Sequence, residues 1–600
     1  MKISYKNNFI GYFKFYYSVL GNKILYCLVM SILISFMDGI GIAMFIPLLQ
    51  FASQAESGAA ASDTSSLGKM QYLTDFIQKM GLDLNVMSIL LVLTTLFVSK
   101  GILKYVQLAY YAKIREEFTK KVRYYLVDSL QGISYTAFLK LDAGKIQNTF
   151  TGEVQRLLQT MTYYFNASQA ASMLITYVVL ALIANYQFAL LVAVGSGLSN
   201  LIYRKIYKTT KQTSFQLAKQ GSDFNSYLIQ SINYFKYLKS TNSFTSYSSK
   251  LKNVIKHTGQ LNFKIGRLNA ISTSIKEPII ICIVSLVIVV QLKWMGTGLD
   301  SIIFSLLMFY RALTYLILIQ SSWQKFIEFS GGMNSVAVMT QEMNEAQEKF
   351  GSHKIKTIKK QIEFKDVVFH YDNKVALNNI NLTIPAKQTI ALIGESGSGK
   401  TTIANMIAGL FLPKSGDILI DDVPLKQTDL NEYRSRIGYI SQESVIFNDT
   451  IYNNITFWAE PTAENRKRFE EAVEMASLKE FIEGQPEKEY TNLGDNGILI
   501  SGGQKQRISI ARELYKKADL LILDEATSAL DSETEKMIQE NIEKLHGSYT
   551  MVLIAHRLST IKEADIIYLL EDGKVSVSGS FYEMLEKSSR FQKMVSLQAV

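Results

Sequence analysis

Residues 389–402 read Thr389-Ile-Ala-Leu-Ile-Gly394-Glu395-Ser396-Gly397-Ser398-Gly399-Lys400-Thr401-Thr402. An apolar run of strand-forming residues thus leads directly into the pattern G-x-x-x-x-G-K-[ST], and a helical stretch follows it. The glycines of such a loop let backbone N–H groups surround phosphate oxygens, and the helix N-terminus adds the positive end of a dipole. We therefore predict a nucleotide site over 394–402, with Lys400 on the β- and γ-phosphates and Thr401 holding Mg²⁺. A chance glycine-rich turn is the alternative.

Two further apolar runs end in polar residues of the kind that ATP hydrolysis requires. The first, Leu520-Leu-Ile-Leu-Asp524-Glu525, predicts a buried strand with two carboxylates at its end. Asp524 can order Mg²⁺ through a bound water, and Glu525 is placed to act as general base on the attacking water. His556 follows the second run, in Ile554-Ala-His556-Arg-Leu, where it can stabilise the γ-phosphate. Surface acids at an ordinary strand end and a structural histidine are the alternatives.

The chain from residue 361 onward alternates short runs of β-formers with helical stretches. The runs cover 362–369, 389–393, 520–523 and 551–554. Such alternation is typical of a parallel sheet flanked by helices, so we predict an α/β P-loop ATPase domain over 361–600. The polar, charged segment before it predicts a linker at 346–360.

The first 345 residues predict an all-α, six-helix membrane domain. The chain is 48% hydrophobic and only 19% charged, below the roughly 25% charged residues of a soluble protein. Residues 1–17 are basic and aromatic, which is typical of an interfacial helix. The two cysteines, both in apolar runs, exclude a disulfide scaffold and a Cys-based zinc site. Six segments approach the ~20 apolar residues that cross a bilayer: 24–49, 86–110, 165–184, 188–206, 278–294 and 302–319.

The net charge of +10 is concentrated in one segment, because 204–276 holds thirteen basic residues and one acidic residue, Asp223. Nucleic acid is one conceivable partner. The flanking apolar segments favour a cytosolic loop that obeys the positive-inside rule, so no nucleic acid is expected. Segment 52–85 holds four acidic and two basic residues and should face outside. Segment 111–162, both termini and the ATPase domain should then be cytosolic.

A second motif is more specific than the phosphate loop: Ser501-Gly502-Gly503-Gln504-Lys505-Gln506-Arg507. With it, residues 361–595 resemble the nucleotide-binding domain of ABC transporters, where this segment caps the ATP held by another domain's phosphate loop. The resemblance implies that ATP and Mg²⁺ are the cofactors, with Thr401, Gln442 and Asp524 at the metal. It also implies Tyr371 as the aromatic that stacks on adenine, and 528–531 as the loop that crosses the dimer.

The chain contains one phosphate loop and one such signature. Because each ATP in this family lies between two domains, we expect a homodimer with two equivalent composite sites. One departure from the family pattern is visible, since Gly494-Asp-Asn496-Gly497 stands where G-E-R-G is usual. The missing arginine implies a different contact between the nucleotide domain and the transport domain, without an effect on hydrolysis.

The membrane half resembles the exporter class of ABC proteins, as a half-transporter. Segments 134–144 and 225–231 are similar to the coupling helices that pass the closure of the nucleotide domains to the membrane. Amphipathic bundle surface is the alternative for both segments. In that class the closure is a rigid-body motion that opens the cavity outward.

The charged residues within the predicted spans include Asp38, Lys100, Lys104 and Arg311. A charge at the bilayer centre costs at least ~2.5 kcal/mol, so it normally faces a wet interior or a partner. We interpret Lys100 and Arg311 as parts of a cavity wall that grips an anionic head group. An ion pair of Asp38 with Arg311 or with Lys100 is the alternative, as is Lys104 reaching the inner interface.

The membrane half also resembles bacterial flippases of lipid-linked oligosaccharides, in which basic cavity residues meet the pyrophosphate of the lipid carrier. Lys100 stands where an arginine is expected, and it can bind phosphate only as a point charge. The resemblance is carried by Phe150-Thr-Gly-Glu-Val154, by 180–186, by Lys100 before Ala109-Tyr-Tyr111, and by Phe309-Tyr-Arg311.

These features predict an ATP-hydrolysing exporter or flippase in the bacterial cytoplasmic membrane. Its cargo should be an anionic amphipath, such as a lipid-linked oligosaccharide or a related glycolipid. An exporter of peptides or small hydrophobic compounds, of the multidrug type, is the alternative. An ATP-gated channel or regulator is disfavoured, because such proteins often lose the base or the signature in one site and Glu525 and Ser501 are present here.

Overall fold

The computed structural model describes residues 8–45, 48, 85–184, 186–290, 299–372, 374–524, 532–554 and 561–598. Contacts divide the chain into two compact units. The first comprises Met1–Ile133 and Ala137–Gln347, and the second comprises Ser134–Thr136 and Glu348–Val600.

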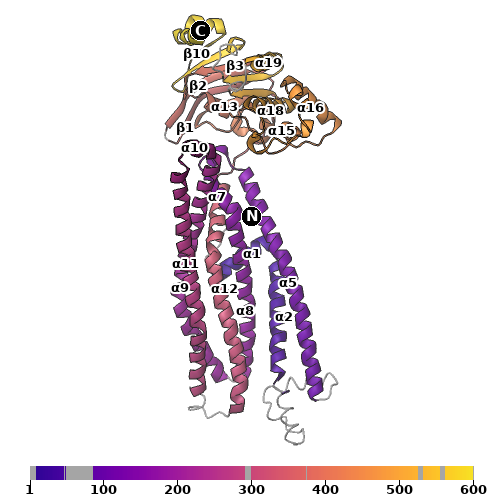
Figure 1. Cartoon of the computed structure of the whole chain (residues 1–600), viewed down its shortest axis with the longest axis vertical. Coiled ribbons are helices and arrows are strands. Elements are labelled where there is room, and N and C mark those ends of the chain that lie inside the picture. Colours follow the sequence, from indigo (N-terminus) through magenta and orange to yellow (C-terminus); the bar gives the residue numbers. More distant parts are fainter. Residues whose placement is uncertain are drawn as a thin grey trace. The chain divides into compact units, whose positions relative to one another are not determined.

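The first unit is helical. Within it, α8 packs along α12, and α9 packs against both α11 and α12 (Figure 1). Among the described residues, α2 and α5 are long and apolar enough to cross a membrane. The elements of this first unit are α1 (Phe9–Leu20), α2 (Lys23–Ala43), α5 (Val86–Gln131), α7 (Ala143–Asn148), the π-helix η2 (Thr149–Glu153), α8 (Val154–Ala184), α9 (Tyr186–Asn233), α10 (Phe235–Ser240), α11 (Phe244–Val290) and α12 (Leu299–Glu345). The short helix α6 (Tyr135–Phe138) contains residues assigned to both units.

The predicted interfacial helix corresponds to α1, and one face of it is buried. Tyr12, Phe15, Tyr16 and Val19 are buried at the spacing of a single helix face. They join an aromatic core to which α5, α8 and α12 also contribute. The hydroxyl of Tyr16 pairs with Thr160 Oγ1 at 2.9 Å, so this buried polar group has a partner.

The predicted spans lie on the long helices, with residues 46–47, 49 and 291–294 outside the described part of the chain. Segment 225–231, predicted as a coupling helix, lies inside α9, which continues to Asn233. Segment 225–231 itself contains no Gly or Pro, and Asn225 bonds back along the helix to the Gly221 carbonyl at 3.0 Å. The separate short helix at this end of α9 is α10.

The second unit contains two sheets flanked by helices (Figure 1). The larger has the order β10-β9-β3-β8-β7-β6 and is parallel except for β10 at its edge. The smaller, β2-β1-β4-β5, is antiparallel. The strands are β1 (Gln361–Tyr371), β2 (Lys374–Pro385), β3 (Thr389–Gly394), β4 (Ser415–Ile420), β5 (Val423–Pro424), β6 (Ile437–Ile440), β7 (Leu520–Asp524), β8 (Thr550–Ile554), β9 (Ile566–Glu571) and β10 (Lys574–Gly579).

Three of the four predicted strand runs join the parallel sheet, whereas 362–369 does not. This run is β1, which pairs antiparallel with β2. Only two residues separate β1 from β2, and so short a connection can join antiparallel neighbours but no parallel ones. The prediction of one parallel sheet is therefore corrected to a parallel sheet plus a smaller antiparallel one.

The central strands are buried on both faces. In β7, Leu520 and Ile522 enter one core while Leu521 and Leu523 enter another. Full burial explains why these strands are continuous apolar runs instead of alternating ones. The helices of this unit are α13 (Lys400–Ile407), α14 (Leu430–Ser435), α15 (Ile451–Thr456), α16 (Ala463–Met475), α17 (Lys479–Glu483), α18 (Gly502–Tyr515), α19 (Ser532–Glu543), α21 (Phe581–Lys587) and α22 (Ser589–Gln598).

Candidate functional site

The phosphate loop connects the end of β3 to the start of α13, as its sequence predicts. Gly394, Gly397 and Gly399 have φ values of 145°, 82° and 106°, a region that residues with a Cβ rarely enter. A Cβ on Gly394 would lie 2.3 Å from the Leu570 carbonyl oxygen. Only glycine therefore lets this backbone curl against β9 and direct its N–H groups into the loop.

The loop holds Lys400 in place before any phosphate arrives. Lys400 Nζ donates to the carbonyl oxygens of Gly394 and Glu395, at 2.8 and 2.9 Å. The Ser398 hydroxyl is buried and has no hydrogen-bond partner among the described residues. A buried hydroxyl without a partner, beside an ammonium group at a helix N-terminus, suits an incoming anion. The residues of this loop thus fit a nucleotide phosphate.

The parallel register brings the other predicted site residues to the same edge of the sheet. Gly394, Asp524 and Ile554 end the neighbouring strands β3, β7 and β8, and Asp524 pairs in register with Ile554. Ligands of open α/β sheets bind at this carboxyl edge. Gln442 follows the end of β6, the strand beside β7, and is exposed. Thr401, Gln442 and Asp524 thus belong to the donor types, hydroxyl, amide and carboxylate, that suit Mg²⁺.

Asp524 is buried at the end of β7, and its carboxylate affects a neighbouring tyrosine. Burial and the nearby Asp524 carboxylate raise the pKa of Tyr439 well above its usual range. Glu525 and His556 follow Asp524 and β8 directly in sequence, but they lie outside the described residues, as does 528–531. Their predicted roles as base, γ-phosphate contact and dimer loop stay predictions.

Tyr371 lies close to the phosphate loop although 22 residues separate it from Gly394 in the chain. Its hydroxyl is 3.3 Å from Thr402 Oγ1, and its ring packs edge-on against Phe411 and Phe369. The side chain is 43% exposed. An exposed ring held at this place can stack on a base whose phosphates occupy the loop.

The signature motif starts a helix through a reciprocal cap. The hydroxyl of Ser501 accepts from Gln504 N, and Gln504 Oε1 accepts from Ser501 N at 2.9 Å, which together form a capping box. Ser501 and Gly502 are exposed, while Gly503 is half-buried. The N-terminal end of α18 is therefore open to an external anion.

In the first unit, Asp38 and Lys100 of the predicted spans form one compact polar cluster with Tyr177. Lys100 of α5 forms an ion pair with Asp38 of α2, and Tyr177 Oη of α8 donates to the other carboxylate oxygen at 2.6 Å. Tyr177 in turn stacks on Tyr315 of α12, with ring centroids 5.5 Å apart. Asp38 is only 4% exposed. Of the two ion pairs that the sequence left open, the structure contains Asp38–Lys100.

Arg311 and Lys104 are exposed and form no ion pair with the acidic residues that the structure describes. Sequence reasoning missed Tyr177 as the second partner of Asp38. A tyrosine inside an apolar run was the available signal, because a buried phenol hydroxyl needs a hydrogen-bond partner.

Comparison with known proteins agrees with this geometry. Residues 377–528 match the family model described as ABC transporter, and 24–316 match the ABC transporter transmembrane region. The heterocyst differentiation ATP-binding protein HepA of Nostoc sp. strain PCC 7120 is 32% identical over 79% of this chain and 78% of its own length. The chain belongs to the ABC transporters. It is an ATPase coupled to membrane transport, and it binds ATP.

Two further comparisons place this ABC transporter among the exporters. An ATP-dependent lipid A-core flippase of Photorhabdus laumondii is 29% identical over 85% of this chain and 88% of its own length. A solved bacterial Atm1-family ABC exporter with ATP bound superposes with a TM-score of 0.80 at 21% identity, over 97% of this chain and 99% of that one. The fold is thus that of a half-transporter exporter, a helical transmembrane domain followed by a nucleotide-binding domain, and the protein is a multi-pass membrane protein.

The departure from the family pattern has a local conformational explanation in this ABC exporter. Asn496 adopts φ = 50°, between Gly494 at 70° and Gly497 at 64°. Asparagine is several-fold enriched in this left-handed region relative to other non-glycine residues. Lys505 Nζ of the signature donates to the Asn496 carbonyl at 2.8 Å and fixes the turn.

Proposed function

We propose that this ABC transporter works as a homodimer that couples ATP hydrolysis to the export of an anionic amphipath across the bacterial cytoplasmic membrane. The cargo that fits best is a lipid-linked oligosaccharide or a related glycolipid. The observation that carries this proposal is Arg311 of α12, an exposed cation within a predicted span that forms no ion pair with the acidic residues the structure describes. A cation there is costly, so it normally serves a ligand or a partner.

The dimer is supported by the two halves of the ATP site that one chain presents. Lys400 sits in a loop made for the β- and γ-phosphates, while Ser501 and Gly502 lie at an exposed helix N-terminus. A second copy can bring its Ser501 against the nucleotide held by this phosphate loop. Two copies then give two equivalent sites, each closed by the partner's signature.

The chemistry at each site follows from these side chains. Lys400 exchanges its hydrogen bonds to two loop carbonyl oxygens for contacts to the β- and γ-phosphates. Tyr371 stacks on the adenine. Thr401, Gln442 and Asp524 would hold Mg²⁺, which neutralises charge developing on the phosphates when bound. Glu525 accepts a proton from the attacking water, and His556 steadies the γ-phosphate. Closure of the dimer is then passed to the membrane helices.

The cargo proposal gains support from the relative that is called a lipid A-core flippase. The ion pair in the membrane unit favours a second candidate. Asp38 cancels the charge of Lys100, so of the two proposed cargo cations only Arg311 is an exposed cation without an ion pair to a described acidic residue. An exporter of small hydrophobic compounds or peptides needs fewer free cations, and it is the alternative.

The test is ATPase activity of the full chain in lipid nanodiscs. A polyprenyl-pyrophosphate-linked sugar should stimulate hydrolysis in the wild type, and Glu525→Gln should bind ATP without turnover. Arg311→Gln should lower the stimulation, with the basal rate unchanged. Stimulation by peptides or hydrophobic compounds but not by the glycolipid would establish the second candidate. Unchanged hydrolysis in Glu525→Gln would refute the assignment of the base.

A further inference from the structure

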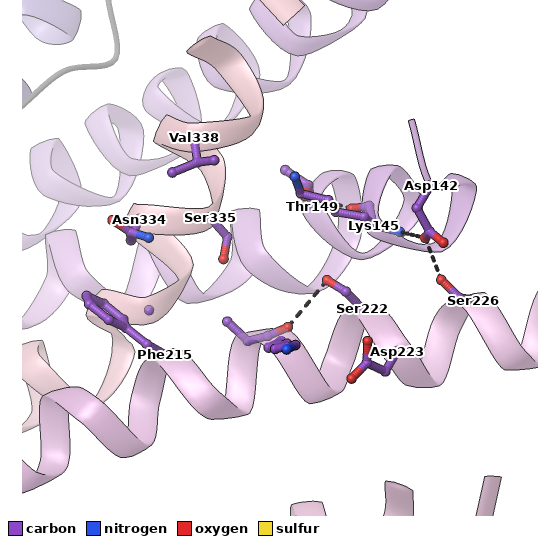
Figure 2. Close-up of a pocket in the computed structure, with 13 residues that line it drawn as sticks. Asp142, Lys145, Thr149, Phe215, Ser222, Asp223, Ser226, Asn334, Ser335 and Val338 are labelled. Carbon is purple, nitrogen blue, oxygen red and sulfur yellow. Dashed lines mark hydrogen bonds between the residues drawn. The ribbon is translucent and has the colours of Figure 1, made fainter. Parts of the chain in front are cut away.

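A cavity of about 410 Å³ lies in the first unit, where α7, η2, α9 and α12 meet (Figure 2). Its volume is within the ~300–1,000 Å³ of small-molecule sites. It is distinct from the Asp38 cluster, since none of Asp38, Lys100 and Tyr177 lines it. The site residues of the nucleotide domain also lie elsewhere, in the other unit.

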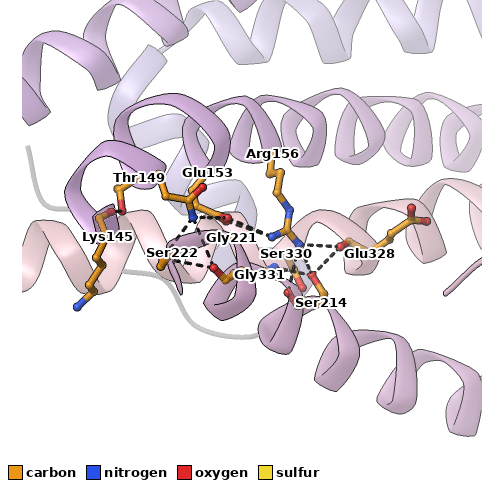
Figure 3. A network of polar contacts seen from close by, with 12 residues as sticks. Lys145, Thr149, Glu153, Arg156, Ser214, Gly221, Ser222, Glu328, Ser330 and Gly331 are labelled. Atoms are coloured by element: carbon orange, nitrogen blue, oxygen red, sulfur yellow. Dashed lines mark hydrogen bonds and ion pairs between the residues drawn. The ribbon is translucent and has the colours of Figure 1, made fainter. Parts of the chain in front are cut away.

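The elements around the cavity are held by a buried polar network (Figure 3). Arg156 of α8 pairs with Glu153 at 3.2 Å and donates to Ser214 Oγ of α9 at 2.9 Å. Ser214 Oγ accepts from the backbone N of Gly331 of α12 at 3.0 Å. Glu153 is 3% exposed and Ser214 is fully buried. Such a satisfied network fixes three helices relative to one another.

The π-helical turn joins this network to the cavity wall. Asn148 precedes η2 and donates to Glu153 Oε1 at 3.2 Å and to Ser222 Oγ of α9 at 3.3 Å. Thr149, the first residue of η2, lines the cavity (Figure 2). Single π-helical turns inside helices are rare and occur often at functional sites. The wide turn here sets Thr149 beside the polar groups of α9.

Polar groups without protein partners line the cavity. Lys219 of α9 and Asn334 and Ser335 of α12 form no side-chain hydrogen bond or ion pair within the described part of the chain. An ammonium, an amide and a hydroxyl are therefore available to a ligand. Phe215 adds a partly exposed aromatic face to the same wall.

The charges of the lining select the class of ligand. Two acids, Asp142 and Asp223, balance Lys145 and Lys219, and Lys145 is already held by Glu342 at 2.6 Å. A bare phosphate would thus find one free cation beside two carboxylates. Among the described residues, no group of three His, Cys, Asp or Glu side chains could hold a metal ion. An apolar compound would cover the half-buried Asn334 amide and Ser335 hydroxyl and leave them unpaired, at a cost for each.

A sugar ring can contact the amide, the hydroxyl, a carboxylate and the aromatic ring of this lining. Its hydroxyl or acetamido substituents can bond Asn334, Ser335 and Asp223, and its C–H face can pack on the Phe215 ring. We propose that this cavity is a subsite for the saccharide part of the cargo. The proposal rests on the proposed function in one respect, namely that the saccharide belongs to the exported lipid.

The test uses the full chain in nanodiscs, with three soluble neutral probes: glucose, N-acetylglucosamine and N,N′-diacetylchitobiose. Saturation-transfer NMR and calorimetry should detect binding of at least one of them. The double variant Asn334→Ala/Ser335→Ala should weaken that binding at least tenfold. The matched control is Gln341→Ala, an exposed position of α12 outside the lining, and it should change nothing. An unchanged melting temperature shows that the double variant folds.

Several outcomes overturn the subsite. These are no binding of any of the three sugars, equal binding in the double variant, or binding of inorganic phosphate or glycine at this cavity in place of sugars. Glycolipid-stimulated ATPase activity separates this failure from that of the proposed function. Stimulation without variant-sensitive sugar binding removes the subsite and keeps the glycolipid cargo. Variant-sensitive sugar binding without glycolipid stimulation keeps the subsite and removes the glycolipid cargo.

Discussion

Removal of the Lys100 side-chain charge by Lys100→Met should destabilise the membrane unit by about 3 kcal/mol, because it leaves a buried carboxylate with one donor fewer. Asp38 is 4% exposed, and its polar partners include Lys100 and the Tyr177 hydroxyl at 2.6 Å. Breaking a buried pair costs roughly 3–5 kcal/mol. The lower end applies, because the Lys100 side chain is 21% exposed and solvent can enter.

The reverse change, Asp38→Asn, should cost less, about 1–2 kcal/mol. The Lys100 ammonium can then extend toward water, and the asparagine keeps an acceptor for Tyr177. The double variant Asp38→Asn/Lys100→Met removes both charges, and it should lie within about 1 kcal/mol of the wild type, since neutral replacements of a buried pair are often tolerated. The expected coupling between the two sites is thus roughly 3–5 kcal/mol.

The assay is a denaturant titration of the purified full chain in mixed micelles, followed by glycolipid-stimulated ATPase activity in nanodiscs. A loss below about 1 kcal/mol in Lys100→Met, with no recovery in the double variant, would refute the structural pairing. If the pair only holds the helices, the double variant regains cargo stimulation together with stability. If Lys100 also grips the cargo, stability returns and stimulation does not. Lys104→Met, an exposed position on the same helix, is the matched control.

Three other substitutions test separate parts of the structure. Gly331→Ala should destabilise the membrane unit by about 1–3 kcal/mol in the same denaturant titration. The reason is that a Cβ at this position would lie 2.4 Å from the Ser214 carbonyl oxygen. An unchanged unfolding midpoint would contradict this close approach. Burial raises the pKa of Glu513 above its usual range. Its contribution to stability is therefore complete below the unfolded pKa of about 4.3 and is lost as pH rises through the folded value. Glu513→Gln should raise the melting temperature at pH 7 and have no such effect near pH 4, with a pH-independent difference as the contrary result. Asn496→Arg restores the usual family residue. It should lower the melting temperature of the nucleotide domain, because arginine is less suited than asparagine to a backbone φ of 50°. A higher melting temperature would show that the turn rearranges.

The local features of this protein follow from its sequence because each depends on a short, contiguous pattern. The strand, glycine-rich turn and helix over 389–402 form as the spacing predicts, and the parallel order of β3, β8 and β7 brings Asp524 to the same edge. The capping box of Ser501 and Gln504 likewise depends on a pattern only four residues long. Hydrophobic length alone also indicates helices across the membrane unit.

The tertiary structure decided what depends on contacts between segments far apart in the chain. Spacing cannot show whether Asp38 pairs with Lys100 or with Arg311, because that choice is set by how α2, α5 and α12 pack. The antiparallel pairing of β1, the approach of Tyr371 to Thr402, and the meeting of α9 and α12 at Asn334 have the same origin. Each contact arises because the burial of apolar faces packs the helices and strands together. The polar groups that meet in this way are not linked by any pattern in the sequence.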